Sequence, residues 1–262
     1  AMEGVKYFLV PNVKNFSWMT VVAAMGQMFY SLSIAMGILI TFGSYMKKET
    51  SLEDSTRNVE VFDTAIAIMA GLMIIPAVFA FSGGDPDTLQ AGPALMFITI
   101  PKVFENMGFG TVVGILFFLL VLFAAVTSSI ALTESAVSTF EDELGWSRRR
   151  ATVLVGVIMI ALGSLSSLGY GPLAGIKIIG MQFLDFFDFL TNSVMMPIAA
   201  MLTSLFVSRI VGMKRMEEEI MHGESTFRRK KIFIVMIKYL CPVFALIILI
   251  SSVANAFGWI AM

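Results

Sequence analysis

The sequence predicts an all-α integral membrane protein. Of its 262 residues, 57% are hydrophobic and 14% are charged, and the mean hydropathy is +0.85. One soluble domain of this length could not bury so much apolar surface. Six apolar segments are long enough to cross a bilayer, and most basic residues fall in alternate loops between them, as is typical of multi-pass proteins. The formal net charge of −1 gives no reason to expect a nucleic-acid partner.

The six predicted transmembrane spans cover approximately residues 18–46, 60–82, 108–140, 151–169, 179–211 and 231–260. Each is long enough to span the bilayer with some tilt. Residues 83–107 are more apolar than a simple solvent-exposed linker, but glycines and prolines interrupt them too often for a transmembrane span. This pattern predicts an extracellular helical loop. Residues 212–230 mix acidic and basic side chains, which predicts a cytoplasmic loop with a short amphipathic helix. We therefore expect a single membrane domain over residues 1–262.

The basic residues predict the orientation of the chain. The loops on one side contain Lys47, Lys48, Arg57, Arg148, Arg149, Arg150, Arg209, Lys214, Arg215, Arg228, Arg229, Lys230 and Lys231. The loops on the other side contain Lys6, Lys14, Lys102 and Lys177. Because cytoplasmic loops accumulate basic residues, we expect a multi-pass protein of the cell (inner) membrane with its first residue and its C-terminus on the extracellular side. The opening residues resemble the middle of a loop, so we also expect the chain to be a fragment of a longer protein.

The centre of the first span is unusually polar for a lipid-facing helix. Residues 26–37 contain Ser31, Ser33 and Ala35 between two glycines, where Leu, Ile, Val and Phe would be expected. One interpretation is that a polar ligand binds there. The other is that the hydroxyls bond back to carbonyls of their own helix, or that the small residues let a neighbouring helix approach.

Two further sites place polar groups at membrane depth. Asp63 lies near the start of the second span, where it is either a helix-start residue that suits the helix dipole or a buried functional carboxylate. In the middle of the third span, three consecutive hydroxyls begin at Thr127 and follow two alanines that begin at Ala124. Such hard oxygens suit a small hard cation, although hydroxyls in membrane helices also bond backward or simply pack.

Near the outer end of the fifth span, Asp185 and Asp188 lie three residues apart and so share a helix face. Asp185 fits a solvent-exposed position at the outer surface of the membrane, whereas Asp188 is followed directly by the apolar run.

Nothing in the chain predicts an enzyme. Cys241 is a lone cysteine in an apolar segment and His222 sits in a charged loop, and there is no Ser/His/Asp set, metal-ligand cluster or phosphate loop.

Six motifs, in order along the chain, resemble a known family. They are residues 26–37, Thr41-Phe-Gly-Ser-Tyr, Ile75-Pro-Ala, Phe97-Ile-Thr-Ile-Pro, 124–129 and Phe140-Glu-Asp-Glu-Leu. Together they resemble the neurotransmitter:sodium symporters, in the bacterial amino-acid branch. The resemblance implies family helices six to eleven of a LeuT-type inverted-repeat bundle, with the first span discontinuous. It also implies a symporter that imports an amino acid with sodium by alternating access.

The resemblance also implies roles for individual residues. The substrate-binding residues would be Tyr30, Ser31, Ser33, Met36, Ser128 and Leu132. Two sodium sites would each be only partly supplied by this chain, with Ser31 and Asp63 in one and Ala124, Thr127 and Ser128 in the other. Gating residues would be Gln27 and Asp188 on the outer side, and Tyr45 and Asp142 on the inner side. The remaining partners would lie on the missing N-terminal helices of the parent transporter.

Two departures from the family pattern refine these expectations. Asp63 aligns where asparagine is frequent, and a fixed carboxylate there implies that chloride is not needed. Met36 replaces a common phenylalanine, and a flexible thioether can repack around different side chains, which favours a hydrophobic or aromatic amino acid as substrate. The sequence leaves one alternative open, which is a non-transporting membrane scaffold or inactive half-transporter that lacks the first five helices.

Overall fold

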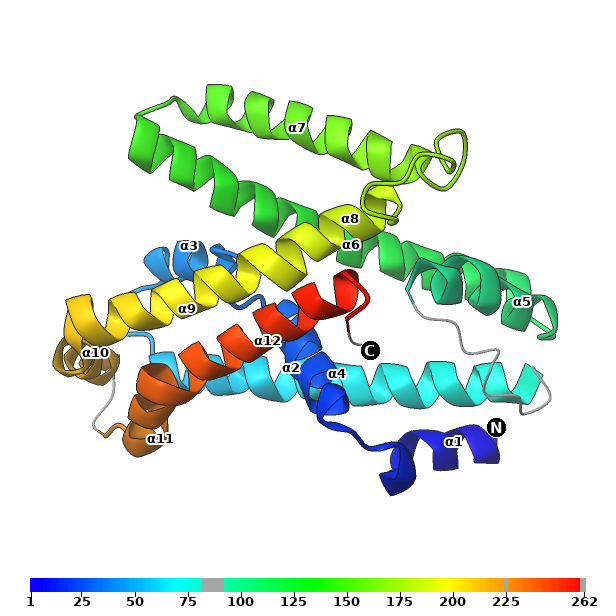
Figure 1. The fold of residues 1–262 in the computed structure, drawn as a ribbon, viewed down its shortest axis with the longest axis horizontal. Helices are drawn as coiled ribbons and strands as arrows, with labels where there is room; N and C mark the ends of the chain where they lie inside the picture. Colours follow the sequence, from blue (N-terminus) through cyan, green and yellow to red (C-terminus); the bar gives the residue numbers. More distant parts are fainter. Residues whose placement is uncertain (82–91, 224–225, 260–262) are drawn as a thin grey trace. The chain divides into compact units, whose positions relative to one another are not determined.

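The structure of the protein is a computed structural model that describes residues 1–81, 92–223 and 226–259. Throughout these residues, helices form the framework (Figure 1). The chain divides into two compact units. The first comprises Ala1–Phe16 and Asn58–Ser129, and the second comprises Ser17–Arg57 and Ile130–Met262.

The first unit is built around the two long helices α4 and α6, both of which continue into the second unit. Its elements are α1 (Met2–Leu9), η1 (Val13–Asn15), α4 (Leu52–Phe81), η3 (Leu95–Thr99), α5 (Ile100–Glu105) and α6 (Gly110–Leu144). α5 packs on α4 through a core of Val78, Ile100 and Val103. α1 packs on α4 where Gly4 meets Pro76, since a Cβ added to Gly4 would lie 2.7 Å from the Pro76 Cα. The predicted loop of short helices corresponds to η3 and α5, while residues 82–91 of that prediction lie outside the described part.

The second unit contains the broken first segment and all the helices after α6. Its elements are α2 (Trp18–Ser31), α3 (Ile38–Ser44), α7 (Arg148–Leu168), α8 (Phe183–Asp188), η4 (Phe189–Met195), α9 (Met196–Phe206), η5 (Val207–Gly212), α10 (Met213–Ile220), η6 (Met221–Gly223), α11 (Lys230–Val235), η7 (Met236–Leu240) and α12 (Cys241–Ala256). α9 lies alongside α12 (Figure 1). The end of α6 packs on α7 through Val137, Ala151 and Val155.

Three π-helical segments precede prolines. η3, η4 and η7 lead into α5, α9 and α12, and these helices carry Pro101, Pro197 and Pro242 at their starts. A proline lacks the N–H of the regular ladder and its ring clashes with the carbonyl four residues earlier. In the wider π-helical turn, hydrogen bonds join residues five apart, so the regular bond between residues four apart, which proline cannot make, is not required there. Each of these three helical runs therefore continues past its proline.

The described residues contain five long apolar helical runs and one broken segment at the places of the six predicted spans. By length and composition, five helical runs can span a membrane. They are Leu52–Ala80, Gly110–Leu144, Arg148–Leu168, Phe183–Ile220 and Lys230–Ala256. The sixth segment is the pair α2 and α3, separated by a non-helical stretch. The predicted fold class, with its first span discontinuous, is therefore confirmed.

Candidate functional site

The break between α2 and α3 is the most distorted backbone of the second unit's described residues. α2 ends in a Schellman motif, in which the N–H of Ile34 donates to the Phe29 carbonyl at 2.9 Å and the N–H of Ser33 donates to the Tyr30 carbonyl at 3.0 Å. Ser33 and Ala35 take φ values of 54° and 63°. Non-glycine residues rarely adopt this left-handed conformation, so the surrounding fold imposes it. Local strain of this kind concentrates at functional sites.

Both halves of the broken helix leave backbone groups without an intrahelical partner. In α3 the first helical bond runs from the Thr41 N–H to the Gly37 carbonyl at 2.9 Å, so the N–H groups of the three residues before Thr41 have no intrahelical acceptor, and the N-cap, Gly37, contributes no side-chain acceptor. In a bilayer, irregular backbone is tolerated only where it lines a cavity or is buried in protein. The break is therefore a place where a polar ligand can meet exposed backbone dipoles.

The predicted substrate residues lie along this break and on α6. Ser31 is the last residue of α2, and Met36 is half-buried just before Gly37. Ser33 lies on the wall of a mainly apolar cavity of about 380 Å³ between α2, α3, α9 and the η7–α12 run. Ser128 and Leu132 are four residues apart on α6, on one helix face, and both are exposed.

A second cavity of the second unit is polar. It has a volume of about 340 Å³, and three helical runs line it: α2, the α8–η4 run and α12. Its lining residues are Val22, Ala23, Gly26, Gln27, Tyr30, Asp188, Asn192, Ser193, Ile248 and Ser252. The structure thus brings together both predicted outer-gate residues and the predicted aromatic lid. The sequence did not point to Asn192, Ser193 or Ser252, because α12 is apolar for most of its length and no motif marks Ser252.

The hydroxyl patch of α6 lies in the first unit. The Thr127 hydroxyl donates to the Ala124 carbonyl at 2.9 Å, so the back-bonding that the sequence allowed for is present. The Thr127 hydroxyl oxygen and the Ala124 carbonyl oxygen both retain lone pairs. The hydroxyl proton can rotate away from the carbonyl, so that both oxygens could bind a cation. Among the described residues no group of three His, Cys, Asp or Glu side chains is placed to hold a metal. A cation here would therefore be held by hydroxyl and carbonyl oxygens, which suits a small hard ion.

Asp63 lies about three turns into α4, since that helix begins at Leu52. The acids of its first turn are Glu53 and Asp54. The Ser51 hydroxyl accepts a hydrogen bond from the Asp54 N–H at 3.0 Å and so caps this helix. The helix-start interpretation of Asp63 therefore does not hold, because the dipole acts within the first turn.

The far end of α3 is joined to α6 and α7 by charged and hydroxyl groups. The Tyr45 hydroxyl donates to Glu134 at 2.7 Å. Arg148 forms ion pairs with Glu134 and with Glu141. The predicted inner-gate acid, Asp142, is exposed on the same helix. Glu134 and Arg148 were not among the predicted site residues, although an acid six residues after Ser128 in a mainly apolar run was a signal for one of them.

A second link on this side is made by hydroxyls. The Thr41 hydroxyl donates to Ser135 at 3.4 Å and pairs at the same distance with Ser138. Thr41 and Ser135 are both buried. Gly37 approaches α6 closely, since an added Cβ would lie 2.6 Å from the Ser135 hydroxyl oxygen. α3 is therefore joined to the second half of α6 at Thr41 and at its N-cap, Gly37.

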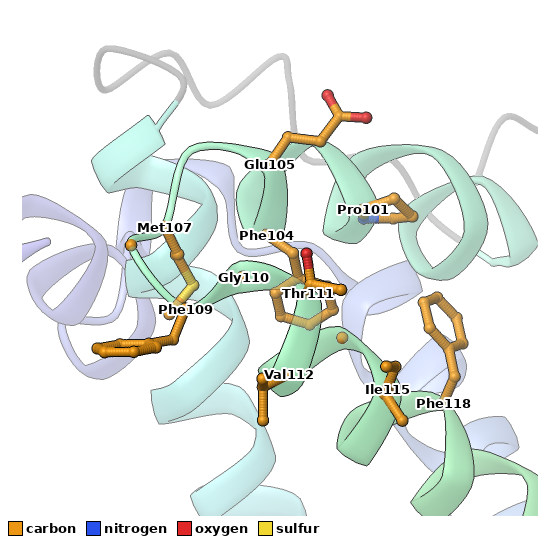
Figure 2. A pocket seen from close by; sticks show the side chains of 12 residues that line it. Pro101, Phe104, Glu105, Met107, Phe109, Gly110, Thr111, Val112, Ile115 and Phe118 are labelled. Atoms are coloured by element: carbon orange, nitrogen blue, oxygen red, sulfur yellow. The ribbon is translucent and has the colours of Figure 1, made fainter.

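A larger cavity in the first unit is lined by none of the predicted site residues. It measures about 610 Å³ and lies at the corner between α5 and α6. Figure 2 shows apolar side chains around it, among them Phe104, Phe109 and Phe118, with Glu105 as a charged residue at its edge. Its chemistry is that of an apolar surface hollow at a helix corner.

Comparisons with known proteins agree with one another. Residues 1–258 match the model of a family described as the sodium:neurotransmitter symporter family. An uncharacterised sodium-dependent transporter of Bacillus subtilis, YhdH, is 33% identical over 225 residues, covering 86% of this chain and 49% of its own. One from Haemophilus influenzae is 32% identical over 253 residues, covering 96% and 54%.

A solved structure is similar over nearly the whole chain. The crystal structure of MhsT in complex with L-phenylalanine matches with a TM-score of 0.83 and 35% identity, over 96% of this chain and 56% of that one. The chain therefore spans about half the length of the relatives that it matches.

Proposed function

The chain belongs to the sodium:neurotransmitter symporter family, and from that membership we propose that the protein containing it imports an amino acid together with sodium by alternating access. The observation that carries this proposal is the break between α2 and α3. At this break, backbone carbonyl and N–H groups lie outside the regular hydrogen bonds of a helix. In a bilayer such groups must be hydrogen-bonded within the protein or line a cavity. A zwitterionic amino acid and a small cation can both use such groups.

Sodium is proposed to occupy two sites, each only partly supplied by this chain. In one, Ala124 would contribute its carbonyl oxygen and Thr127 and Ser128 their hydroxyls. In the other, Ser31 and Asp63 would contribute side-chain oxygens. Support comes from the place of Asp63 well inside α4, beyond the first turn of that helix. The fixed charge of Asp63 would make chloride unnecessary.

The substrate is proposed to be a hydrophobic or aromatic amino acid. Tyr30 would cover it, and Ser31, Ser33, Met36, Ser128 and Leu132 would line its pocket. The thioether of Met36 adapts its shape to different apolar side chains. MhsT, which is 35% identical, was crystallised with L-phenylalanine, and this supports an aromatic substrate here.

Two gates, one on the outer side and one on the inner side of the membrane, are proposed to close alternately and so exclude water from the substrate site. On the outer side, Gln27 and Asp188 share the polar cavity of the second unit. On the inner side, Tyr45 and Asp142 would act with Glu134 and Arg148, which the structure adds. This scheme assigns the protein to the cell (inner) membrane, with the first residue and the C-terminus of this chain outside. The remaining gate partners would come from helices that precede this chain.

The proposal is tested by equilibrium binding of labelled L-phenylalanine to the purified full-length protein, with and without sodium. We expect binding that requires sodium and a sodium affinity that rises when the amino acid is present, because coupling between two ligands is reciprocal. Equal binding in sodium and in potassium would contradict the proposed coupling to sodium, and an absence of binding in both salts would favour a non-transporting scaffold.

The sodium assignment has its own test. Thr127→Ala should weaken sodium affinity by about tenfold, because a coordinating oxygen is lost from a site with few ligands. Thr139→Ala is the matched control, since the Thr139 hydroxyl also bonds back to a carbonyl of α6, that of Ser135, at 2.8 Å. An equal sodium response in both variants would mean that the Thr127 hydroxyl only packs.

A further inference from the structure

The polar cavity of the second unit contains a side chain that touches the outer-gate carboxylate directly. Asn192 lies one turn after Asp188, and its amide nitrogen donates to the Asp188 Oδ1 at 2.5 Å. Both residues line the cavity of about 340 Å³, together with Gln27 on the facing helix α2. Asp188 is exposed, whereas Asn192 is half-buried. The donor is therefore the more buried of the two residues, and the acceptor is the more exposed one.

The local backbone explains why this pair forms. Asp188 is the last residue of α8, and the π-helical segment η4 begins at the next residue. The hydroxyl of the neighbouring Thr191 bonds back to the Phe187 carbonyl at 2.8 Å, so it is satisfied within its own helix. The side chain of Asn192 instead reaches the carboxylate. π-helical turns inside α-helices are frequent at functional sites.

This bond has a chemical consequence for the gate. A carboxylate offers two oxygens with about four acceptor positions, and an amide nitrogen is a donor only. With Oδ1 held by Asn192, the other oxygen remains available and the side chain keeps one orientation. Fixing a group before it closes on its partner removes the entropy cost of ordering it at closure.

We propose that Asn192 is a positioning residue of the outer gate, which holds the Asp188 carboxylate aimed into the cavity shared with Gln27. This inference rests on the proposed transport function and on the gating role of Asp188. Asn192 acts through Asp188 and does not itself contact substrate. The Asn192 amide sets how readily the gate closes over a bound amino acid, and therefore the affinity for that amino acid. It has a smaller effect on the rate of turnover after the gate has closed.

The test is a double-mutant cycle on the full-length protein in proteoliposomes. Sodium-dependent uptake of L-phenylalanine is measured for the wild type, Asn192→Ala, Asp188→Ala and the double variant, with Thr191→Ala as the matched control. We expect Asn192→Ala to raise the half-saturating concentration about fivefold, within the range of coupling seen for residues in contact, and to change the maximal rate much less. In the Asp188→Ala background, Asn192→Ala should have no further effect, and Thr191→Ala should behave as wild type.

The outcomes separate this proposal from the function on which it rests. Equal and independent effects of Asn192→Ala in both backgrounds, or a loss of maximal rate with unchanged half-saturation, would overturn the positioning role. An absence of sodium-dependent uptake in the wild type would instead contradict the proposed function. The positioning role would then be decided by an experimental structure of Asn192→Ala. A displaced Asp188 side chain supports the proposal, and an unchanged Asp188 side chain overturns it.

Discussion

Gly37 combines two constraints that no other residue type meets at low cost. Its φ of 80° is left-handed, and an added Cβ would lie 2.6 Å from the Ser135 hydroxyl oxygen. Ser33 and Ala35 share the left-handed conformation but have a side chain already. The break thus depends on Gly37 for both its backbone turn and its close approach to α6.

Gly37→Ala is therefore expected to destabilise the full-length protein by about 1–2 kcal/mol from the backbone alone, with a further cost from the contact with Ser135. Gly43→Ala, in α3, is the matched control, because no atom lies within 4 Å of its added Cβ and alanine favours a helix. Thermal unfolding in detergent measures both. A melting temperature of Gly37→Ala equal to that of Gly43→Ala would contradict the role assigned to Gly37 in the break.

The same stretch shows what could be predicted at the residue level. The small and polar residues near Ser31 indicated that the helix was unusual, and the family resemblance implied a break. The position of the left-handed residue was not predictable, because helix C-termini usually place glycine there and here it is Ser33. Only the packing of the surrounding helices selects that residue. Likewise, the sequence could not separate the two interpretations of Asp63, because they depend on where α4 begins.

At the level of helices, α3 and α6 are joined by a cluster at the Tyr45 end. Tyr45, Glu134 and Arg148 form a chain of hydrogen bonds and an ion pair. Arg148 is well exposed, and exposed ion pairs add little to stability, typically about 0–1 kcal/mol. The ion pair therefore contributes little to the stability of the fold, and we propose that the cluster keeps the inner end of the transporter closed.

Tyr45→Phe is expected to lower the apparent affinity for sodium and substrate about threefold, because a less populated closed state reduces apparent affinity in proportion. The unfolding temperature should stay close to that of the wild type. Glu143→Gln, an exposed acid on the same helix end, serves as the control and should change neither quantity. A large fall in unfolding temperature for Tyr45→Phe would show that the cluster is structural.

The order of the long apolar helices was predictable from the sequence, and their bounds were less so. Apolar composition marks the part of a helix that lies in lipid, so the predicted span of 60–82 omits the polar first turns of α4, which begins at Leu52. α6 runs past the predicted end at 140 to Leu144, where Gly145, with a φ of 62°, follows the helix. The π-helical turns before Pro197 and Pro242 were not predictable, because composition does not distinguish a kinked helix from a continuous one.

At the scale of the whole molecule, the family assignment rests on nearly the full chain, since residues 1–258 match the family model. The chain covers about half the length of its relatives. The proposed outer-gate residues Gln27 and Asp188 and the proposed substrate lid Tyr30 line one cavity of the second unit. The proposed sodium ligands Asp63, Ala124, Thr127 and Ser128 belong to the first unit. Function is accordingly proposed for the full-length protein.

Coupling of sodium entry to the import of an amino acid is the activity that we propose for the full-length protein. It is tested most directly by uptake of labelled L-phenylalanine into proteoliposomes containing the full-length protein, with an imposed inward sodium gradient. We expect labelled L-phenylalanine to accumulate inside the proteoliposomes above its external concentration. This accumulation should be lost when the sodium gradient is removed. Uptake that is absent, or that is the same with and without the sodium gradient, would contradict the claim.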